Sequence, residues 1–299
     1  MTATTTTAGR DAVSASRPVS PGVVNALGTV PFFAYTAVFL VLPTVLVVIG
    51  AFQSRGGGFT LNGFTQVLSP RTVNIFGTSL WISLLTALVG AIAGGVIAYA
   101  LTLSPEGSLG RRVFTALMSV TAQFGGVMLA FAFIATIGIN GLVTRLLSAF
   151  PALTPDPGFL SSLGGVAVVY CYFQIPLMVI VFLPAVEGLR PQWREATENL
   201  GGTSWTYWTR VAGPILLPSL LGSFLLLFAN AFSAFATAAA LISQQSVIVP
   251  LEIESALRNE NDLGMDAYAQ ALAFGMIVVV ALVMGAYALL MRRAARWAQ

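Results

Sequence analysis

The residues of this chain that could carry out chemistry are few, and the types most used in catalysis are missing. All 14 basic residues are arginine, and the chain has neither lysine nor histidine. A P-loop ATPase needs a lysine on its phosphates, and most general bases and zinc sites use histidine. Cys171 has no second cysteine to pair with, so we expect a buried, inert thiol. We therefore predict a non-catalytic protein with no metal and no cofactor.

The most ordered polar segment is residues 190–218, which separates two long hydrophobic stretches. Pro191 suits the first position of a helix, where its missing N–H costs nothing. The glycine pair at 201–202 should end that helix. Thr203 or Ser204 can then cap a second one. The segment is predicted to form two short helices broken at the glycines.

Side chains in this segment form an apolar stripe and a polar pair. Trp193, Ala196 and Leu200 recur at helical spacing, so they share one face. Arg194 and Glu198 are four residues apart and can pair weakly. A plain explanation for such a segment is two amphipathic helices lying on the bilayer, with the tryptophans among the headgroups. The second helix is expected to carry Trp205, Trp208 and Val211 on one side.

The elements around this segment must be membrane helices. Hydrophobic residues make up 57% of the chain, charged residues 8%, and the mean hydropathy is +0.86, whereas a soluble domain has about a quarter charged residues. Six stretches without any charge each exceed the roughly 20 residues that a membrane-spanning helix needs. We therefore predict an all-α polytopic membrane protein. Its six transmembrane helices are expected at residues 30–52, 75–103, 113–138, 163–185, 214–241 and 268–291.

The arginines indicate how these helices are oriented. With the N-terminus inside, ten arginines fall in inner segments and four in outer loops, and cytoplasmic loops carry the basic excess. Both termini and the loop 186–213 are therefore expected in the cytoplasm. The net charge of +3 is scattered over span ends rather than gathered on one face. Membrane lipid is thus the expected surrounding, and nucleic-acid binding is excluded.

Uncharged polar residues in the spans are candidates for lining a path across the membrane. No acidic or basic side chain lies within a predicted span, which argues against a carrier built on a charged proton or sodium relay. The alternative role for each candidate is a hydrogen bond to a neighbouring helix, which contributes about 0.6–2 kcal/mol. Both roles stay open for Gln123, Gln174, Asn230 and Ser233.

The segment 252–266 is expected outside the membrane and is acidic. It holds five acidic residues against one arginine, Arg258. A solvated loop would explain this composition. The other explanation is that the segment helps to receive a substrate-binding protein or attracts a cationic solute.

The spacing within 190–218 resembles a known loop. Glu195-Ala196, then Gly201, then Pro214 match the Glu-Ala-Ala, Gly, Pro pattern before the penultimate span of binding-protein-dependent (type I) ABC importer permeases. In that family the loop is where the membrane subunit meets its ATPase. The resemblance therefore favours docking to a partner over lying on the bilayer.

Two positions depart from the family pattern. Thr197 stands where the second alanine is usual, and Gly213 precedes the proline where leucine is common. Both departures are tolerable, because a small residue keeps the docking face slim and Gly-Pro still makes the turn. The resemblance covers about residues 76–291, including the segments 170–176, 249–253 and 266–271.

The resemblance implies a fold, partners and residue roles. The fold is that of a type I ABC importer permease with a MetI-like transmembrane domain. The implied partners are ABC ATPase subunits, a second permease subunit and an extracytoplasmic substrate-binding protein. The residues assigned to ATPase coupling, within 190–214, are Arg194, Glu195, Ala196, Gly201, Gly202 and Pro214.

These expectations divide the chain into four parts in the cytoplasmic membrane of a prokaryote. They are a disordered cytoplasmic tail (1–25), the first transmembrane helix with its outer loop (26–75), the core permease domain with its coupling loop (76–291), and a cytoplasmic C-terminal tail (292–299).

Three functions compete. The first is a subunit forming half of the path of an ATP-driven importer. The second is an independent secondary carrier or channel without an ATPase partner. The third is a membrane enzyme, which the missing histidine and lysine disfavour. The resemblance points to a small polar or charged solute, as carried by permeases for polyamines, ferric iron, sulfate or another inorganic anion, thiamine or aminophosphonates.

Overall fold

The protein is helical throughout its described part. The computed structural model describes residues 21–53, 58–105, 107–148, 156, 158–242, 248–258 and 265–297. Besides helices, this part contains an isolated antiparallel bridge between Gln53 and Phe59. Six helical stretches in it are long and apolar enough to cross a membrane, which confirms the predicted fold class. They are Thr29–Gly50, Pro70–Thr102, Gly126–Leu147, Leu163–Glu187, Ser204–Phe232 and Met265–Leu289.

The chain divides into two compact units, Met1–Val47 and Val48–Gln299. From residue 21 onward the first unit is one helical run, in which α1 (Pro21–Thr36) is followed by the π-helical turn η1 (Ala37–Val41) and by the start of α2 (Leu42–Gly50). The amide of Leu42 donates to the carbonyl of Ala37, five residues back. Pro43 follows directly and has no N–H, so the π turn lies where the regular bonding pattern is interrupted.

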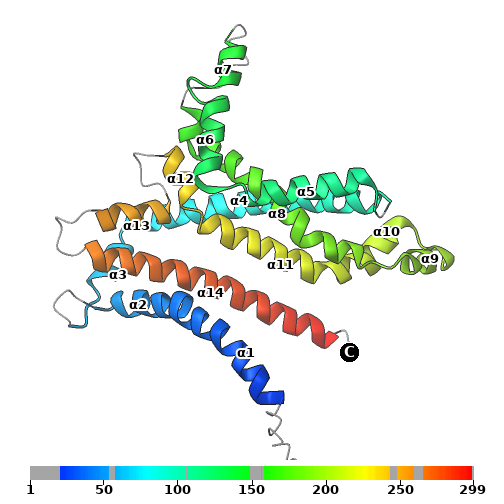
Figure 1. The fold of residues 1–299 in the computed structure, drawn as a ribbon, viewed down its shortest axis with the longest axis horizontal. Helices are drawn as coiled ribbons and strands as arrows, with labels where there is room; N and C mark the ends of the chain where they lie inside the picture. The colour runs from blue at the N-terminus through cyan, green and yellow to red at the C-terminus, as the bar shows by residue number, and fades with distance from the viewer. Residues whose placement is uncertain are drawn as a thin grey trace, which may run out of the picture. The chain divides into compact units, whose positions relative to one another are not determined.

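The second unit is a bundle of long helices with short helices at its two ends (Figure 1). The long helices are α4 (Pro70–Thr102), α5 (Leu109–Gln123), α8 (Leu163–Glu187), α11 (Gly213–Phe232) and α14 (Met265–Trp297). One end carries α3 (Asn62–Val67) and α13 (Val249–Arg258), and the other carries α9 (Pro191–Asn199) and α10 (Ser204–Tyr207). The remaining helices are α6 (Gly126–Ile137), α7 (Leu142–Leu147), η3 (Phe159–Ser161), η4 (Trp208–Ala212) and α12 (Ala236–Leu241).

Small residues bring α4 and α8 into close contact. A Cβ atom added at Gly94 would lie 2.5 Å from the Cβ of Met178 and 2.6 Å from the carbonyl oxygen of Ile175. A Cβ added at Gly90, one turn earlier, would lie 2.9 Å from the Cβ of Gln174. Gly90 and Gly94 thus form a Gly-x-x-x-Gly pair that allows the two backbones to approach. The side chains packed on this contact include the fully buried Met178.

The third and fifth predicted helices are broken, so the expectation of continuous helices at 113–138 and 214–241 was wrong. α5 ends at Gln123, and Gly126, with a φ of +67°, starts α6 in a new direction (Figure 1). The left-handed region is open mainly to glycine, which explains the break at this position. α11 ends at Phe232, and α12 starts after a short interruption. The other four spans agree with the prediction to within about two helical turns.

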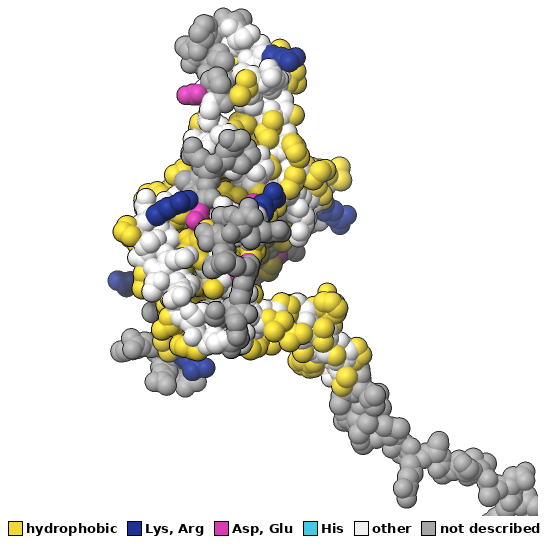
Figure 2. All heavy atoms as spheres, turned by 90° about the vertical axis from the view of Figure 1, so that its left-hand side faces the viewer, with side chains coloured by type: hydrophobic (Ala, Val, Ile, Leu, Met, Phe, Trp, Pro, Cys, Tyr) yellow, Lys and Arg dark blue, Asp and Glu magenta, His cyan; other side chains and the backbone are white. Residues whose placement is uncertain are grey.

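Charged side chains are sparse on the surface of the bundle. Figure 2 looks at the end that carries α3 and α13, and it shows a few charged groups among hydrophobic and uncharged polar ones. Large apolar residues are widely exposed on the helices, among them Trp81, Ile92 and Leu282. Such exposure suits helices that face lipid.

The contact between α4 and α8 gives a stability prediction. We expect Gly94→Ala to lower the free energy of unfolding by about 1–3 kcal/mol, because the added methyl group overlaps the backbone of α8. Gly95→Ala is the matched control, since its Cβ would find only the Phe182 ring at 4.0 Å. Thermal unfolding of the purified variants in detergent measures both. Equal stability of the two variants would contradict the close contact.

Candidate functional site

The loop predicted to couple to a partner forms two helices joined by a tight turn. α9 begins with Pro191 and ends in a Schellman motif. The amide of Gly201 donates to the carbonyl of Glu198 at 2.9 Å, and the amide of Gly202 donates to that of Thr197, also at 2.9 Å. Gly201 has a φ of +77°, in the region that favours glycine. The predicted helix, break and second helix are thus confirmed.

Thr197, one of the two departures from the family pattern, has a specific partner in Gly202. Its side chain is buried, and a Cβ added at Gly202 would lie 2.7 Å from its methyl carbon. The Thr197 hydroxyl donates to the carbonyl of Trp193 at 2.8 Å, which satisfies it within α9. The second glycine therefore makes the room that a threonine needs here.

The second helix is held by a capping box. The side chain of Thr203 accepts a hydrogen bond from the amide of Thr206, whose own hydroxyl accepts one from the amide of Thr203. Two of the amides that a helix start leaves unpaired are satisfied in this way. The loop is therefore a stiff structure rather than a flexible linker.

Three apolar side chains of the loop are turned outward. Leu200 is 89% exposed and Trp205 is 77% exposed, and Ala196 is exposed as well. Glu195 is also exposed on α9. A leucine and a tryptophan this exposed, side by side with charged groups on a rigid turn, form a surface suited to a protein partner.

The predicted pair on α9 is present. Arg194 Nε donates to Glu198 Oε1 at 3.0 Å. This hydrogen bond is the main cause that raises the pKa of Arg194 above its usual value. Arg190 lies over the ring of Trp193, with its guanidinium carbon 6.0 Å from the ring centre. Both arrangements stiffen the exposed face of α9.

The loop is anchored to the bundle through Trp208. Its ring meets that of Tyr99 on α4 edge to face, with centroids 5.0 Å apart. Trp208 also starts the π-helical turn η4, in which the amide of Gly213 donates to the Trp208 carbonyl. A Cβ added at Gly213 would lie 2.5 Å from that oxygen. This explains the second departure from the family pattern, since a glycine directly before Pro214 lets the π turn form.

The two broken helices meet each other inside the second unit. Thr237 of α12 donates its hydroxyl to the carbonyl of Gly126 at 3.2 Å. Tyr170 of α8 donates to the carbonyl of Ala234, between α11 and α12, at 2.5 Å. Two backbone carbonyls at the breaks thus accept hydrogen bonds from protein side chains, which suits irregular backbone in a low-dielectric surrounding.

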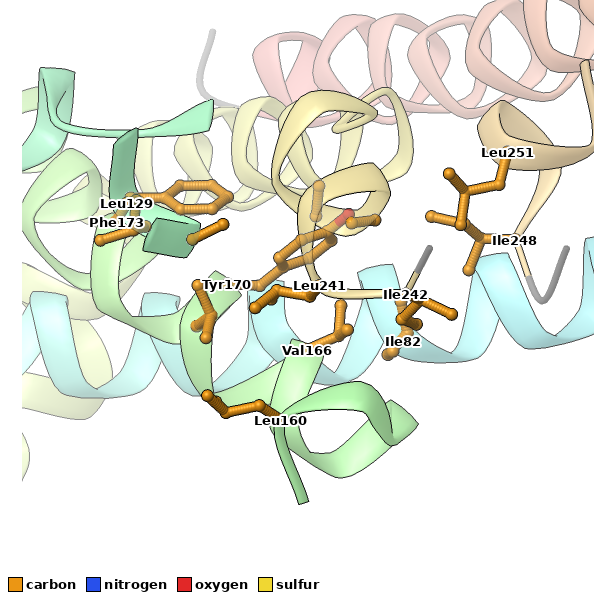
Figure 3. Close-up of a cluster of buried hydrophobic side chains, with 14 residues drawn as sticks. Ile82, Leu129, Leu160, Val166, Tyr170, Phe173, Leu241, Ile242, Ile248 and Leu251 are labelled. Carbon is orange, nitrogen blue, oxygen red and sulfur yellow. The ribbon is translucent and has the colours of Figure 1, made fainter. Parts of the chain in front are cut away.

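An apolar cluster surrounds these bonds. Figure 3 shows Tyr170 among the buried side chains Leu129, Phe173 and Leu241. They come from α6, α8 and α12, so the cluster fixes the two broken helices and α8 together.

Three of the four predicted path residues lie at the breaks. Gln123 is the last residue of α5, Ser233 is the C-cap of α11, and Asn230 is one turn before it. All three are exposed on the isolated chain. Gln174 is different, because it is fully buried and its Nε2 donates to the carbonyl of Leu227 at 2.8 Å. The structure thus brings Asn230 and Ser233 together at the second break, whereas Gln174 lies where α8 packs against α4 and α11.

A cavity of about 480 Å³ opens beside Ser233. Phe235 lines it from the break, and Ile253 of α13 and Met276 of α14 line it from the other side. Its surface is mainly apolar, with the side chains of Glu254 and Arg258 among the lining groups. The break in α11 is thus open to a space large enough for a small solute.

Two acidic residues of the segment 252–266 are already paired within the chain. Glu252 is buried, with its Oε2 3.6 Å from Arg71 Nη2. Glu254 forms an ion pair with Arg258. Neither carboxylate is therefore available as an unpaired charge for a cationic solute. Residues 259–264 lie outside the described part.

Some residues of the candidate site were not predicted from the sequence. Thr237 and Tyr170 tie the breaks together, and neither had been assigned a role in the site. The neighbouring glycines 125–126 were a possible signal for the first break, but glycines in a span also serve helix packing. The second break, at residues 233–235, contains neither glycine nor proline.

Comparison with known proteins shows which proteins this chain resembles. Residues 150–296 match the family described as "Binding-protein-dependent transport system inner membrane component". The sulfate transport system permease protein CysT of Escherichia coli is 26% identical over 220 residues, which cover 74% of this chain and 75% of that protein. The spermidine/putrescine transport system permease protein PotB of Haemophilus influenzae is 21% identical over 262 residues, covering 85% and 90% of the two chains.

The fold is also found in a solved transporter. A chain of a bacterial alginate ABC transporter, crystallised with an alginate pentasaccharide-bound periplasmic protein, superposes with a TM-score of 0.71 at 17% identity. The match covers 91% of this chain and 94% of the other. At this identity the similarity concerns the fold.

The contact between Thr197 and Gly202 gives a prediction for the loop. Gly202→Ala should destabilise the turn by about 1–3 kcal/mol, because the new methyl group overlaps the Thr197 side chain. Thr197→Ala in the same chain should restore part of this loss, and only part, since the Thr197 carbonyl at 2.9 Å stays in place. Hydrogen exchange of the α9 and α10 amides measures the effect.

Gly188→Ala is the control for this pair, because its Cβ would meet only carbonyl oxygens at 3.4 and 3.5 Å. If the effects of the Thr197 and Gly202 substitutions simply add, the contact does not shape the turn.

Proposed function

Because this chain belongs to the binding-protein-dependent ABC importer permeases, we propose that it forms half of a solute path and is driven by a separate ATPase. As a multi-pass protein of the cytoplasmic membrane, it would hold the path while its partner hydrolyses ATP. The observation that carries the proposal is the stiff loop of α9 and α10, with Leu200 and Trp205 exposed on it. The role of this loop in the family and its exposed apolar surface both support an ATPase as the partner.

The coupling role falls on residues that the loop presents or shapes. Glu195 and the Arg194–Glu198 pair offer charged contacts, and Ala196 allows close approach. Gly201 and Gly202 set the angle between the helices. Pro214, next to the π turn, leads from the loop into α11.

The loop is proposed to face the cytoplasm, together with both termini. In Figure 1 the C-terminal end of α14 lies at the same end of the second unit as α9 and α10. Arg111 and Arg112 at the start of α5 and Arg210 after α10 add to the arginines at this end. The excess of basic residues supports the cytoplasmic assignment.

The helix breaks are proposed to line the path, opposite a second permease subunit. Irregular backbone at membrane depth is tolerated where it is buried in protein or lines a water-filled cavity, and polar groups such as those of Asn230 and Ser233 are costly against lipid. Discontinuous helices with exposed polar ends are found at the solute sites of transporters. The face with Gln123, Asn230 and Ser233 is therefore assigned to the path and the second subunit, while Gln174 is assigned to helix packing.

The solute is proposed to be small and polar or charged, and to arrive on an extracytoplasmic binding protein. Relatives named for sulfate and for spermidine and putrescine support this class without choosing its member. The described spans hold neither acidic nor basic side chains near the breaks, so the charge of the spans does not choose between an inorganic anion and a polyamine.

Reconstitution tests the proposed function. The permease, purified from its host with the proteins that accompany it, is placed in proteoliposomes, and uptake of labelled sulfate, spermidine and thiamine is measured with and without ATP. We expect a co-purified ATPase and ATP-dependent uptake of one of these solutes when its binding protein is added. Uptake that proceeds without ATP or an ATPase would instead establish an independent carrier or channel.

Gly201→Asp should abolish ATP-driven uptake, since any side chain at a φ of +77° strains the turn and the new carboxylate changes the docking surface. Membrane insertion should remain. Gly110→Asp is the control, because this exposed glycine at the start of α5 has no atom near its Cβ position. Normal uptake by Gly201→Asp would rule out the coupling role of the turn.

Asn230→Leu should reduce uptake about tenfold while leaving thermal stability unchanged, as expected for a path residue that contacts the solute. Asn230→Gln, which keeps the amide, should retain most of the activity. Uptake assays and unfolding curves of both variants separate the two roles. A loss of stability without a specific loss of uptake would show that Asn230 only packs helices.

A further inference from the structure

An ion pair joins α5 to the end of α8 directly before the coupling loop. Arg111, in the first turn of α5, donates from Nη2 to Oε1 of Glu187, the last residue of α8. Its Nη1 donates to the carbonyl of Ser104 at 3.4 Å. The Arg111 side chain is only 12% exposed and the Glu187 side chain is 41% exposed, so the pair is sheltered on the arginine side.

α5 is attached to the rest of the bundle along one narrow face. Arg111, Thr115 and Met118 are its partly buried positions in the first three turns, and their spacing places them on one side of the helix. The hydroxyls of Thr115, Ser119 and Thr121 donate to carbonyls of α5 itself. In the described part of the chain, the side-chain hydrogen bonds that lead from α5 to another element are those of Arg111.

The two ends of α5 reach the two parts of the proposed transport machinery. At one end Glu187 is separated from α9 by the residues 188–190. At the other end lies Gln123, followed by the break at Gly126, whose carbonyl accepts a hydrogen bond from Thr237. A helix of 15 residues spans about 22 Å, so α5 connects the coupling loop to the helix breaks as one stiff rod.

We propose that Arg111 and Glu187 form a positioning pair that transmits movement of the coupling loop through α5 to the break at Gln123. This inference rests on the proposed function, because it needs an ATPase to move the loop. When the loop is displaced, Glu187 carries Arg111 and the first turn of α5 with it. The far end of α5 then displaces the break at Gly126, which Thr237 of α12 bonds, and changes the width of the path there.

Electrostatics gives the pair a direct test. Arg111→Glu places two carboxylates together, and Glu187→Arg places two guanidinium groups together, so each single reversal separates α5 from α8. The double reversal Arg111→Glu/Glu187→Arg restores an opposite pair at the same two positions. Arg112→Glu is the matched control, since this neighbouring arginine is exposed and makes the same change of charge.

The experiment compares uptake with ATP hydrolysis in the complete, reconstituted transporter. For each single reversal we expect the solute transported per ATP hydrolysed to fall about tenfold, the size of a typical coupling between two sites, with ATP hydrolysis within about twofold of wild type. The double reversal should recover to within about threefold of wild type, and Arg112→Glu should behave as wild type.

Thiol labelling provides a second readout. In a Cys171→Ser background, Phe124→Cys places a single thiol at the break next to α5. We expect its labelling by a membrane-permeant maleimide to change on ATP addition in wild type, and to be independent of ATP in the Arg111→Glu chain.

The outcomes separate the two proposals. If the wild-type complex shows no ATP-driven uptake, the proposed function fails. If wild type transports and Arg111→Glu keeps the same ratio of uptake to hydrolysis, the positioning pair alone is refuted. If the single reversals unfold or lose ATP hydrolysis and uptake together, and the double reversal does not recover, the pair is structural and the inference is overturned.

Discussion

The close approach of α4 and α8 is the contact on which the rest of the second unit depends. Gly90 and Gly94 present only hydrogen atoms to α8, so Gln174 and Met178 can pack directly against the backbone of α4. Helices in lipid gain little from hydrophobic burial against each other, and close packing with hydrogen bonds has to hold them together. α8 is thus fixed along its length, and it carries the ties to the other helices. Gln174 bonds α11 from its middle, while Tyr170 and Glu187 bond the chain beyond α11 and the start of α5.

The regular helix α8 stabilises the two helix breaks at membrane depth. Lipid cannot satisfy backbone groups at helix breaks, and side chains of α8 and α12 donate to two carbonyls at the breaks after α11 and α5. The exposed polar residues stay on the open side of the same breaks. The two breaks therefore have a bonded side, which packs on α8 and α12, and an open side with exposed polar groups. The open side is the one suited to a solute path.

The membrane helices and the two-helix coupling loop were predictable from the sequence. The charge-free stretches are long, and the residues that start and end the loop helices act on the backbone next to them. Pro191 and the glycines at 201–202 act over a few residues, so their effect can be derived without the fold. The breaks at Gly126 and Ser233 were missed, since a glycine in an apolar run also serves close packing and a serine gives no conformational signal. Arg111 and Glu187 are 76 positions apart, and no periodicity within one helix indicates such a contact.

The placement of charge has an electrical consequence. In the described spans the charged side chains lie near helix ends, as with Arg71 at the start of α4, Glu187 at the end of α8 and Asp266 at the start of α14. Moving one elementary charge through the membrane potential changes the energy by about 2.3 kcal/mol per 100 mV. Helix movements that carry no charge through the field add almost nothing to this term. The voltage dependence of uptake would then be set by the charge of the solute. Measuring uptake at several membrane potentials would therefore report the valence of the transported solute.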